Sequence, residues 1–374
     1  MRPTFPDVFV LPPDASLPSG GNLYNRLFLR ALRRERFPFE IMSLGQAVRA
    51  APDRPGARFW ADSLYLDELA DPARAAAFGP RLFLIVHWIP SRDPGLESRE
   101  ADERRRREDA VFAHAAGFLA TSPRTRRALS GRGQAGKPII VVRPALAVAP
   151  RGRKPAASGF RAVIAANLVR SKGILEFLRR LGTSTTHKDA FVIRIAGRSD
   201  IEPPYAKACL AEIRRSWPGG RIVFTGPKTP GRMRALYETS AVFVTASRME
   251  TYGMAVREAM AFGLPVLALR APYVRSIPRG RGVLRIYDSV EALAEGCAAL
   301  IRSPEELAGL RERAWRRRLR EAYSWEDAAR LFIRRIRSIE ASLRHASSAS
   351  VEGRSGMGKA MRRNPPSSPT PRRP

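Results

Sequence analysis

Residues 245–269 read TASRMETYGMAVREAMAFGLPVLAL and continue the apolar run AVFVTA at positions 241–246. This run is short and rich in β-branched and aromatic residues, which predicts a buried strand. Gly253 allows the chain to turn, residues 254–262 are good helix formers, and Gly263 ends that helix before Pro265 opens a second apolar strand. The segment therefore predicts a strand, a loop, a helix and another strand, which is the repeating unit of a parallel α/β sheet.

Two glutamates lie on either side of the glycine turn. Glu250 is in the loop at the carboxyl end of the first strand, where open α/β sheets bind ligands, and Glu258 lies about one and a half turns into the helix. Both side chains can face one crevice. The N–H groups at the helix start, over residues 252–255, form an anion site. A site that holds phosphate and hydroxyl groups together suits a nucleotide sugar.

The segment resembles the Glu-x7-Glu signature of the retaining glycosyltransferases of family 4, which have the GT-B fold. The match extends beyond the two glutamates to the other positions of the family pattern, at Tyr252, Gly253, Ala259, Met260, Ala261, Gly263, Pro265 and Val266. The resemblance implies that Glu250 contacts the donor sugar and that Glu258 holds the ribose hydroxyls, with Tyr252, Gly253 and Met254 beside the donor. Without that motif, Glu258 would be interpreted as an exposed charge on the helix, and Glu250 as a charge near the helix start that the helix dipole favours.

Basic residues are expected near the departing nucleoside diphosphate, because its new negative charge needs fixed cations or N–H donors. In AANLVRSKGILEF, residues 165–177, the Lys172-Gly173 pair matches the end of the family's Gly-Arg-x4-Lys-Gly segment. Asn167 stands where the family usually has the arginine. The resemblance therefore assigns Lys172 to the phosphates. Arg170 either supplies the missing charge from another angle or faces solvent.

Further site candidates lie at the ends of predicted strands. Gly20 and Gly21 match the glycine pair of the family's first strand-to-helix turn, although tight-turn chemistry alone also explains them. His87 matches a histidine that the family places near the donor sugar, or it is a structural residue at the end of an apolar strand. Gly197 and Gly226 end the second and third strands of the nucleotide domain, beside the base and diphosphate.

The rest of the chain predicts an α/β fold of GT-B architecture, with two Rossmann-like doubly wound domains facing a cleft. We expect an acceptor-side domain over residues 1–146, a Pro/Gly-rich linker over 147–158 and a nucleotide-sugar-binding domain over 159–322. The sequence over 323–344 resembles the family's closing helix, which implies that it returns to the N-terminal domain, although its periodicity alone also fits an ordinary amphipathic surface helix. A disordered basic tail is expected over 345–374. Residues 52–79 show no clear pattern, so we expect an irregular or shortened region there.

Composition narrows the class of protein further. The formal net charge is +31, but the arginines that dominate it are spread along the chain and no nucleic-acid reader motif is present. Weak adhesion to anionic lipid is expected, without specific nucleic-acid binding. The two cysteines lack any disulfide or zinc spacing, and the N-terminus has no apolar h-region. We therefore expect a cytoplasmic protein, peripheral at the inner face of the membrane if it contacts lipid.

The resemblance to family 4 implies a retaining hexosyltransferase that uses a UDP-, GDP- or ADP-sugar and a glycan, lipid-linked or small-molecule acceptor. No Asp-x-Asp sequence occurs, and the basic residues can neutralise the charge that a magnesium ion would otherwise carry. We therefore expect no metal, and no cofactor besides the donor substrate. The alternative is a non-catalytic GT-B subunit that binds a nucleotide sugar or a partner protein, which the asparagine at 167 favours.

Overall fold

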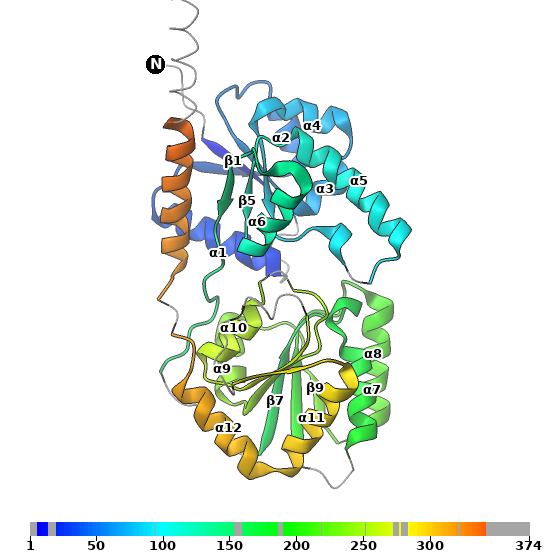
Figure 1. The fold of residues 1–374 in the computed structure, drawn as a ribbon. Coiled ribbons are helices and arrows are strands. Elements are labelled where there is room, and N and C mark those ends of the chain that lie inside the picture. Colours follow the sequence, from blue (N-terminus) through cyan, green and yellow to red (C-terminus); the bar gives the residue numbers. More distant parts are fainter. Residues whose placement is uncertain are drawn as a thin grey trace, which may run out of the picture.

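The computed structural model describes residues 6–13, 20–93, 95–152, 159–185, 190–217, 219–250, 252–271, 277, 283–320 and 322–341. It contains two parallel six-stranded sheets, one in each half of the chain, and helices pack around both (Figure 1). The two α/β domains lie one above the other, with the amino end of α1 and the helix α10 near their junction. The predicted fold class, two Rossmann-like domains in the GT-B arrangement, is confirmed.

The N-terminal sheet has the strand order β2-β1-β3-β4-β5-β6, and every neighbouring pair is parallel. Its strands are β1 (Asp7–Val10), β2 (Phe39–Met42), β3 (Phe59–Asp62), β4 (Leu82–Val86), β5 (Gly117–Ala120) and β6 (Ile139–Val141). Its α-helices are α1 (Gly20–Arg34), α2 (Leu44–Ala50), α3 (Leu66–Leu69), α4 (Pro72–Phe78), α5 (Ser98–His114) and α6 (Pro123–Leu129). Shorter turns are η1 (Ser63–Tyr65), η2 (Gly79–Arg81), η3 (Pro90–Arg92) and η4 (Ser130–Gln134).

The second sheet has the order β12-β11-β10-β7-β8-β9. Its strands are β7 (Phe160–Ala165), β8 (Phe191–Ala196), β9 (Ile222–Phe224), β10 (Val242–Thr245), β11 (Val266–Leu269) and β12 (Leu284–Tyr287). The helical elements are η5 (Arg170–Lys172), α7 (Ile174–Ser184), α8 (Pro203–Ser216), α9 (Pro230–Glu238), α10 (Met254–Ala261), α11 (Val290–Arg302) and α12 (Pro304–Arg316). Because β10 and β7 are neighbours at the centre of the sheet, the loops that follow them meet at its carboxyl edge.

A C-terminal helix over residues 325–341 packs against the N-terminal domain (Figure 1). Phe332 is fully buried there, and its ring centroid lies 5.2 Å from that of Phe28 and 5.1 Å from that of Trp60. Trp325 donates its indole N–H to the carbonyl of Leu146 at 3.1 Å. The chain thus leaves the N-terminal domain, forms the second one and returns to the core of the first.

Residues 52–79, where an irregular or shortened region is expected, form a series of short regular elements. This stretch contains β3, which lies between β1 and β4 inside the sheet, and α4. All four residues of β3 are buried, so its sequence, FWAD, has no alternation of polar and apolar residues. Four residues give too little pattern for a strand assignment.

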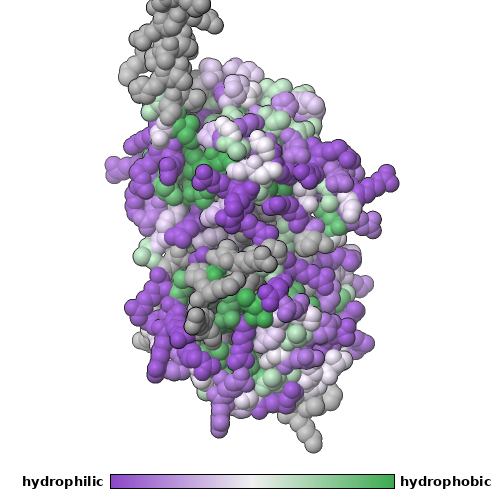
Figure 2. All heavy atoms as spheres, in the orientation of Figure 1, coloured by the Kyte–Doolittle hydropathy of each residue, from purple (hydrophilic) through white to green (hydrophobic). Residues whose placement is uncertain are grey.

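Two predicted segments fall largely outside the described residues. Of the predicted linker, residues 147–152 are described and form no regular element, whereas 153–158 lie outside the described ranges. The predicted basic tail over 345–374 lies outside them entirely. No helix in the described part of the chain is both long and apolar enough to cross a bilayer. On the visible face, hydrophilic side chains are spread over both domains instead of forming one stripe (Figure 2).

Candidate active site

A cavity of about 310 Å³ lies between the two domains, within the usual range for small-molecule sites. We call it the interdomain pocket. The N-terminal domain contributes α1 and the ends of β4 and β5, and the second domain contributes the carboxyl ends of β7, β8, β9 and β10 together with α9 and α10. Its polar or charged lining residues are Tyr24, Arg26, His87, Thr121, Asn167, Lys172, Lys228, Tyr237, Thr245, Glu250, Tyr252 and Glu258.

Lys172 and Glu250 form an ion pair in this pocket through Nζ and Oε1. The loops that carry them are held together by the backbone, because Arg248 N–H donates to the carbonyl of Ser171 at 2.9 Å. Gly173 allows this approach: its φ is +62°, and a Cβ there would lie 2.6 Å from the carbonyl oxygen of Ala246. A cation and a carboxylate are thereby fixed side by side at the carboxyl edge of the sheet.

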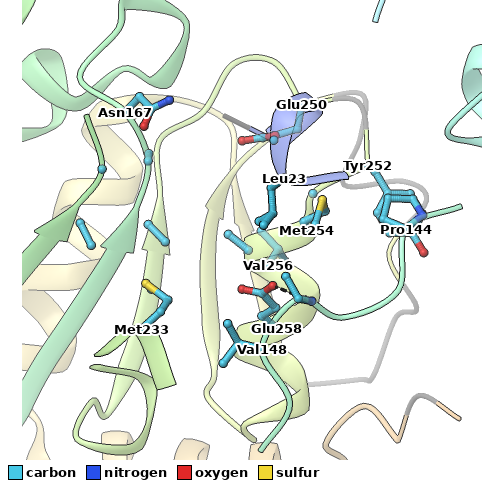
Figure 3. A pocket seen from close by; sticks show the side chains of 18 of the residues that line it. Leu23, Pro144, Val148, Asn167, Met233, Glu250, Tyr252, Met254, Val256 and Glu258 are labelled. Atoms are coloured by element: carbon cyan, nitrogen blue, oxygen red, sulfur yellow. Dashed lines mark hydrogen bonds between the residues drawn. The ribbon is translucent and has the colours of Figure 1, made fainter. Parts of the chain in front are cut away.

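Glu258 points into the same pocket from α10, below Glu250 in Figure 3. Its side chain is not the exposed helix charge of the alternative interpretation, because the residue is only 5% exposed. The Tyr237 hydroxyl donates to Oε2 at 3.0 Å, and the Ala147 N–H donates to Oε1 at 3.2 Å. Burial raises the pKa of Glu258 to about 7, although these hydrogen bonds oppose the shift.

The amino end of α10 faces the pocket between the two glutamates. Tyr252, Gly253 and Met254 all line it, and Gly253 forms the N-cap with a left-handed φ of +74°. The N–H groups of the first helical turn have no partner within the helix and therefore favour an anionic group. Arg257, which sequence reasoning missed, is buried behind this turn with its guanidinium carbon 4.5 Å from the Tyr252 ring centroid.

The N-terminal domain supplies Gly20, Gly21 and His87 to the opposite wall. The two glycines form the first turn of α1 itself, so the expectation that they precede the helix is wrong. A Cβ on Gly21 would lie 3.2 Å from His87 Cδ2, so the missing side chain lets the imidazole pack against the helix. Nε2 of His87 lies 3.0 Å from Asn25 Oδ1 and 3.2 Å from Asp62 Oδ2. Sequence reasoning missed both of these partners.

Two of the predicted residues do not line the pocket. The side chain of Arg170 is 80% exposed and its guanidinium lies 4.0 Å from Glu202, so it takes the solvent-facing alternative. Gly226 is outside the lining, but its carbonyl accepts the N–H of Gly197 at 3.2 Å. Gly197 does line the pocket.

Lys228 is a pocket residue that the sequence did not single out. It follows β9, and its Nζ donates to the backbone carbonyls of Thr225 and Gly226. Asn167 also lines the pocket, but its Oδ1 accepts the backbone N–H of Arg198 at 2.9 Å. The asparagine is therefore a structural link between the ends of β7 and β8. Lys228 lies in the loop after β9, where the strand-end rule could have found it, and Arg26 of α1 is a further cation of the pocket that the sequence did not single out.

Comparison with known proteins gives a family match for the second domain. Residues 159–303 match the family described as glycosyl transferases group 1. A GDP-mannose:cellobiosyl-diphosphopolyprenol alpha-mannosyltransferase of Xanthomonas oryzae is 31% identical over 133 residues, 35% of this chain and 34% of that protein. A D-inositol 3-phosphate glycosyltransferase of Corynebacterium urealyticum is 28% identical over 144 residues, 38% and 33% of the respective chains. The matched stretch thus spans about a third of these curated relatives.

Solved structures with the same fold cover nearly the whole molecule. Sucrose-phosphate synthase from Thermosynechococcus elongatus aligns with a TM-score of 0.67 at 14% identity, over 90% of this chain and 99% of that one. Anabaena HepE in complex with UDP and glucose aligns with a TM-score of 0.61 at 16% identity, over 89% and 99%. These likenesses extend the GT-B fold across both domains, including the N-terminal half, which lies outside the family match over residues 159–303.

Proposed function

We propose that this protein is a retaining glycosyltransferase that moves a hexose-type sugar from a nucleoside-diphosphate sugar to an acceptor hydroxyl, without a metal ion. The observation that carries the proposal is the interdomain pocket, which brings the Lys172–Glu250 pair and the buried Glu258 together around the amino end of α10. The glycosyltransferase family match over residues 159–303 covers the domain that holds all three residues.

Each group has a role that its position supports. Glu258, already an acceptor of two hydrogen bonds, accepts the ribose hydroxyls, and the α10 N–H groups with Lys172 bind the diphosphate. Glu250 contacts the donor sugar next to Lys172. When the bond from C1 to the phosphate oxygen breaks, Lys172 stabilises the charge that grows on the leaving phosphate. The acceptor oxygen bonds to C1 on the same face, and its proton passes to that phosphate.

The donor base and the acceptor follow from similarity alone. The relative from Xanthomonas is named for GDP-mannose and a lipid-linked acceptor, and HepE is solved with UDP and glucose. We therefore propose a UDP-, GDP- or ADP-sugar donor and a glycan or lipid-linked acceptor that contacts the N-terminal domain. We also propose a cytoplasmic location, and a lipid-linked acceptor would favour peripheral binding to an anionic membrane.

A second candidate is a non-catalytic GT-B subunit that binds a nucleotide sugar. Asn167 favours it, because a side chain that caps the Arg198 N–H supplies no charge to a leaving phosphate. Release of free nucleoside diphosphate from a panel headed by GDP-mannose and UDP-glucose separates the two. We expect release that rises with added acceptor lipids and is lost in Glu250→Gln. Binding of the nucleotide without release by the native protein would support the subunit and contradict the enzyme.

A further inference from the structure

The hydrogen bonds of His87 define a buried polar cluster behind the pocket wall. Asp62 ends β3 and His87 follows β4, and these strands are parallel neighbours, so the two side chains meet at the same edge of the sheet. Asn25, on α1, completes the cluster: its Nδ2 donates to Asp62 Oδ2 at 2.5 Å. The cluster therefore joins three segments that are distant in sequence. They meet at His87, the one histidine among the described residues that line the pocket.

Asp62 is held as an acceptor with both oxygens occupied. It is 0% exposed, and its Oδ1 accepts the Leu64 N–H at 2.8 Å while Oδ2 faces Asn25 and His87. Burial raises the pKa of a carboxyl group, but the positive charge that His87 has when protonated and the hydrogen bonds donated by His87, Leu64 and Asn25 outweigh burial, so the pKa of Asp62 is lowered. A buried carboxylate whose partners are all donors is costly to leave unpaired.

This network determines which nitrogen of His87 carries a proton. The Asn25 amide gives its N–H to Asp62, so its Oδ1 is the atom that faces the imidazole. Nε2 therefore meets two acceptor oxygens, from Asn25 and Asp62, and must be the N–H nitrogen. Within the described ranges Nδ1 makes no hydrogen bond. It is the ring nitrogen that remains able to accept one from a ligand.

We propose that Asp62 is a positioning residue for the transfer reaction: with Asn25 it fixes the Nε2–H tautomer of His87, so that Nδ1 accepts a hydrogen bond from a sugar hydroxyl in the interdomain pocket. His87 is 12% exposed on its side chain and lies on the wall opposite the Lys172–Glu250 pair. Its ring also packs edge-on against Tyr24 at 5.2 Å between centroids, which restricts rotation of the imidazole. This proposal rests on the proposed function.

The kinetic test compares Asp62→Ala, Asp62→Asn and His87→Gln with the donor that the panel identifies. Because Asp62→Ala removes a hydrogen bond to a charged group, we expect its turnover to be roughly ten- to a hundredfold lower. Asp62→Asn should restore part of this turnover, because the amide carbonyl can still accept the Nε2–H. Affinity for free nucleoside diphosphate should not change. The double variant Asp62→Ala/His87→Gln should lose no more than His87→Gln alone. Additive losses, or a loss confined to nucleotide affinity, would overturn the positioning role.

A spectroscopic readout keeps this test independent of activity. The chain has four histidines, so ¹⁵N-labelled histidine gives few ring signals, and His87→Gln identifies those of residue 87. We expect a single Nε2–H tautomer in the native protein and a tautomer mixture in Asp62→Ala. Asp7→Asn is the matched control, because Asp7 is another buried carboxylate of this sheet, paired with Arg58 outside the pocket. An unchanged tautomer in Asp62→Ala overturns the inference. A fixed tautomer in a protein that turns over no donor supports the positioning and contradicts the proposed function.

Discussion

The backbone N–H of Ala147 donates a hydrogen bond to Glu258 Oε1 at 3.2 Å. Ala147 belongs to the segment that joins the two domains, and the carbonyl of its neighbour Leu146 accepts the indole N–H of Trp325 from the C-terminal helix. The carboxylate proposed to bind ribose therefore contacts one crossing of the chain between the domains directly, and the adjacent residue of that crossing contacts the other.

Substitution of Glu258 by alanine should weaken binding of free nucleoside diphosphate. A buried carboxylate that accepts ribose hydroxyls contributes about 1.5 to 3 kcal/mol, or roughly ten- to a hundredfold in affinity. Calorimetry on the folded variant measures this change. Glu212→Ala is the matched control, since Glu212 is a buried glutamate of the same domain outside the pocket. Equal affinities for the native protein and Glu258→Ala would remove the ribose assignment.

The raised pKa of Glu258 makes stability depend on pH. Because its pKa is about 7 in the folded protein against 4.5 for an ordinary glutamate, the folded state binds the proton more tightly between these values. The contribution of protonated Glu258 to the free energy of unfolding is therefore fully present below about pH 4.5. About 3 kcal/mol of this free energy is lost as the pH rises through 7. Thermal unfolding of the native protein and of Glu258→Gln between pH 5 and 8 tests this. The native protein should lose stability relative to the variant as the pH rises, and a constant difference would contradict the shift.

Lys172→Ala should lower turnover more than donor affinity, because in the proposed reaction the Lys172 charge faces the phosphate whose negative charge grows in the transition state. A loss of about 2.7 to 4 kcal/mol, on the order of a hundred- to a thousandfold in kcat, is expected. Steady-state kinetics with Lys207→Ala, an exposed lysine of α8, as the control separate kcat from KM. A loss that lies entirely in KM would place Lys172 in ground-state binding instead.

Lys228 and Arg170 give a paired test of which residue supplies the charge missing at Asn167. Lys228 lines the pocket, whereas the Arg170 side chain points to solvent near Glu202. We expect Lys228→Ala to weaken nucleoside-diphosphate binding by about tenfold and Arg170→Ala to leave it within experimental error. Calorimetry at two salt concentrations measures both variants. The opposite order would mean that Arg170 turns into the pocket when the donor binds.

The C-terminal tail is predicted to affect membrane binding and not chemistry. Its sequence has arginine or lysine at 354, 359, 362, 363, 372 and 373 against the single acid Glu352. Each basic residue near an anionic surface contributes about 1 kcal/mol and is screened by salt, so binding should be weak and reversible. Co-sedimentation with anionic vesicles compares the full chain with a 1–344 truncation. Equal binding by both would leave the arginines of the folded domains as the membrane contact.

Sequence reasoning identified the parts of the site that follow a strong local pattern. The elements around residues 245–269 lie within a residue or two of their expected bounds, and Lys172, Glu250 and Glu258 share one pocket as the motif implied. The direction of the Arg170 side chain could not be predicted. Arg170 and Lys172 lie two residues apart in a 3₁₀ helix, so their side chains point in directions roughly 120° apart, and the sequence does not say which one faces inward.

The residues that sequence reasoning missed depend on contacts between distant segments. Asp62 ends a four-residue strand whose sequence does not alternate. That strand could therefore not be predicted, and nothing in the sequence indicated that β4 lies beside it. Asn25 looks like any polar residue of an amphipathic helix until the fold brings it to His87. The Ala147 N–H is a backbone group and carries no side-chain signal at all. Such contacts are set by tertiary packing, which no local pattern records.

Proton NMR of the anomeric signals during one reaction shows whether the interdomain pocket transfers a sugar with retention of configuration. With a donor that the native protein binds and an acceptor present, we expect a product of the same anomeric configuration as the donor, and no product with Glu250→Gln. A product of inverted configuration, or a donor that stays unchanged beside a protein that binds its nucleoside diphosphate, would contradict it.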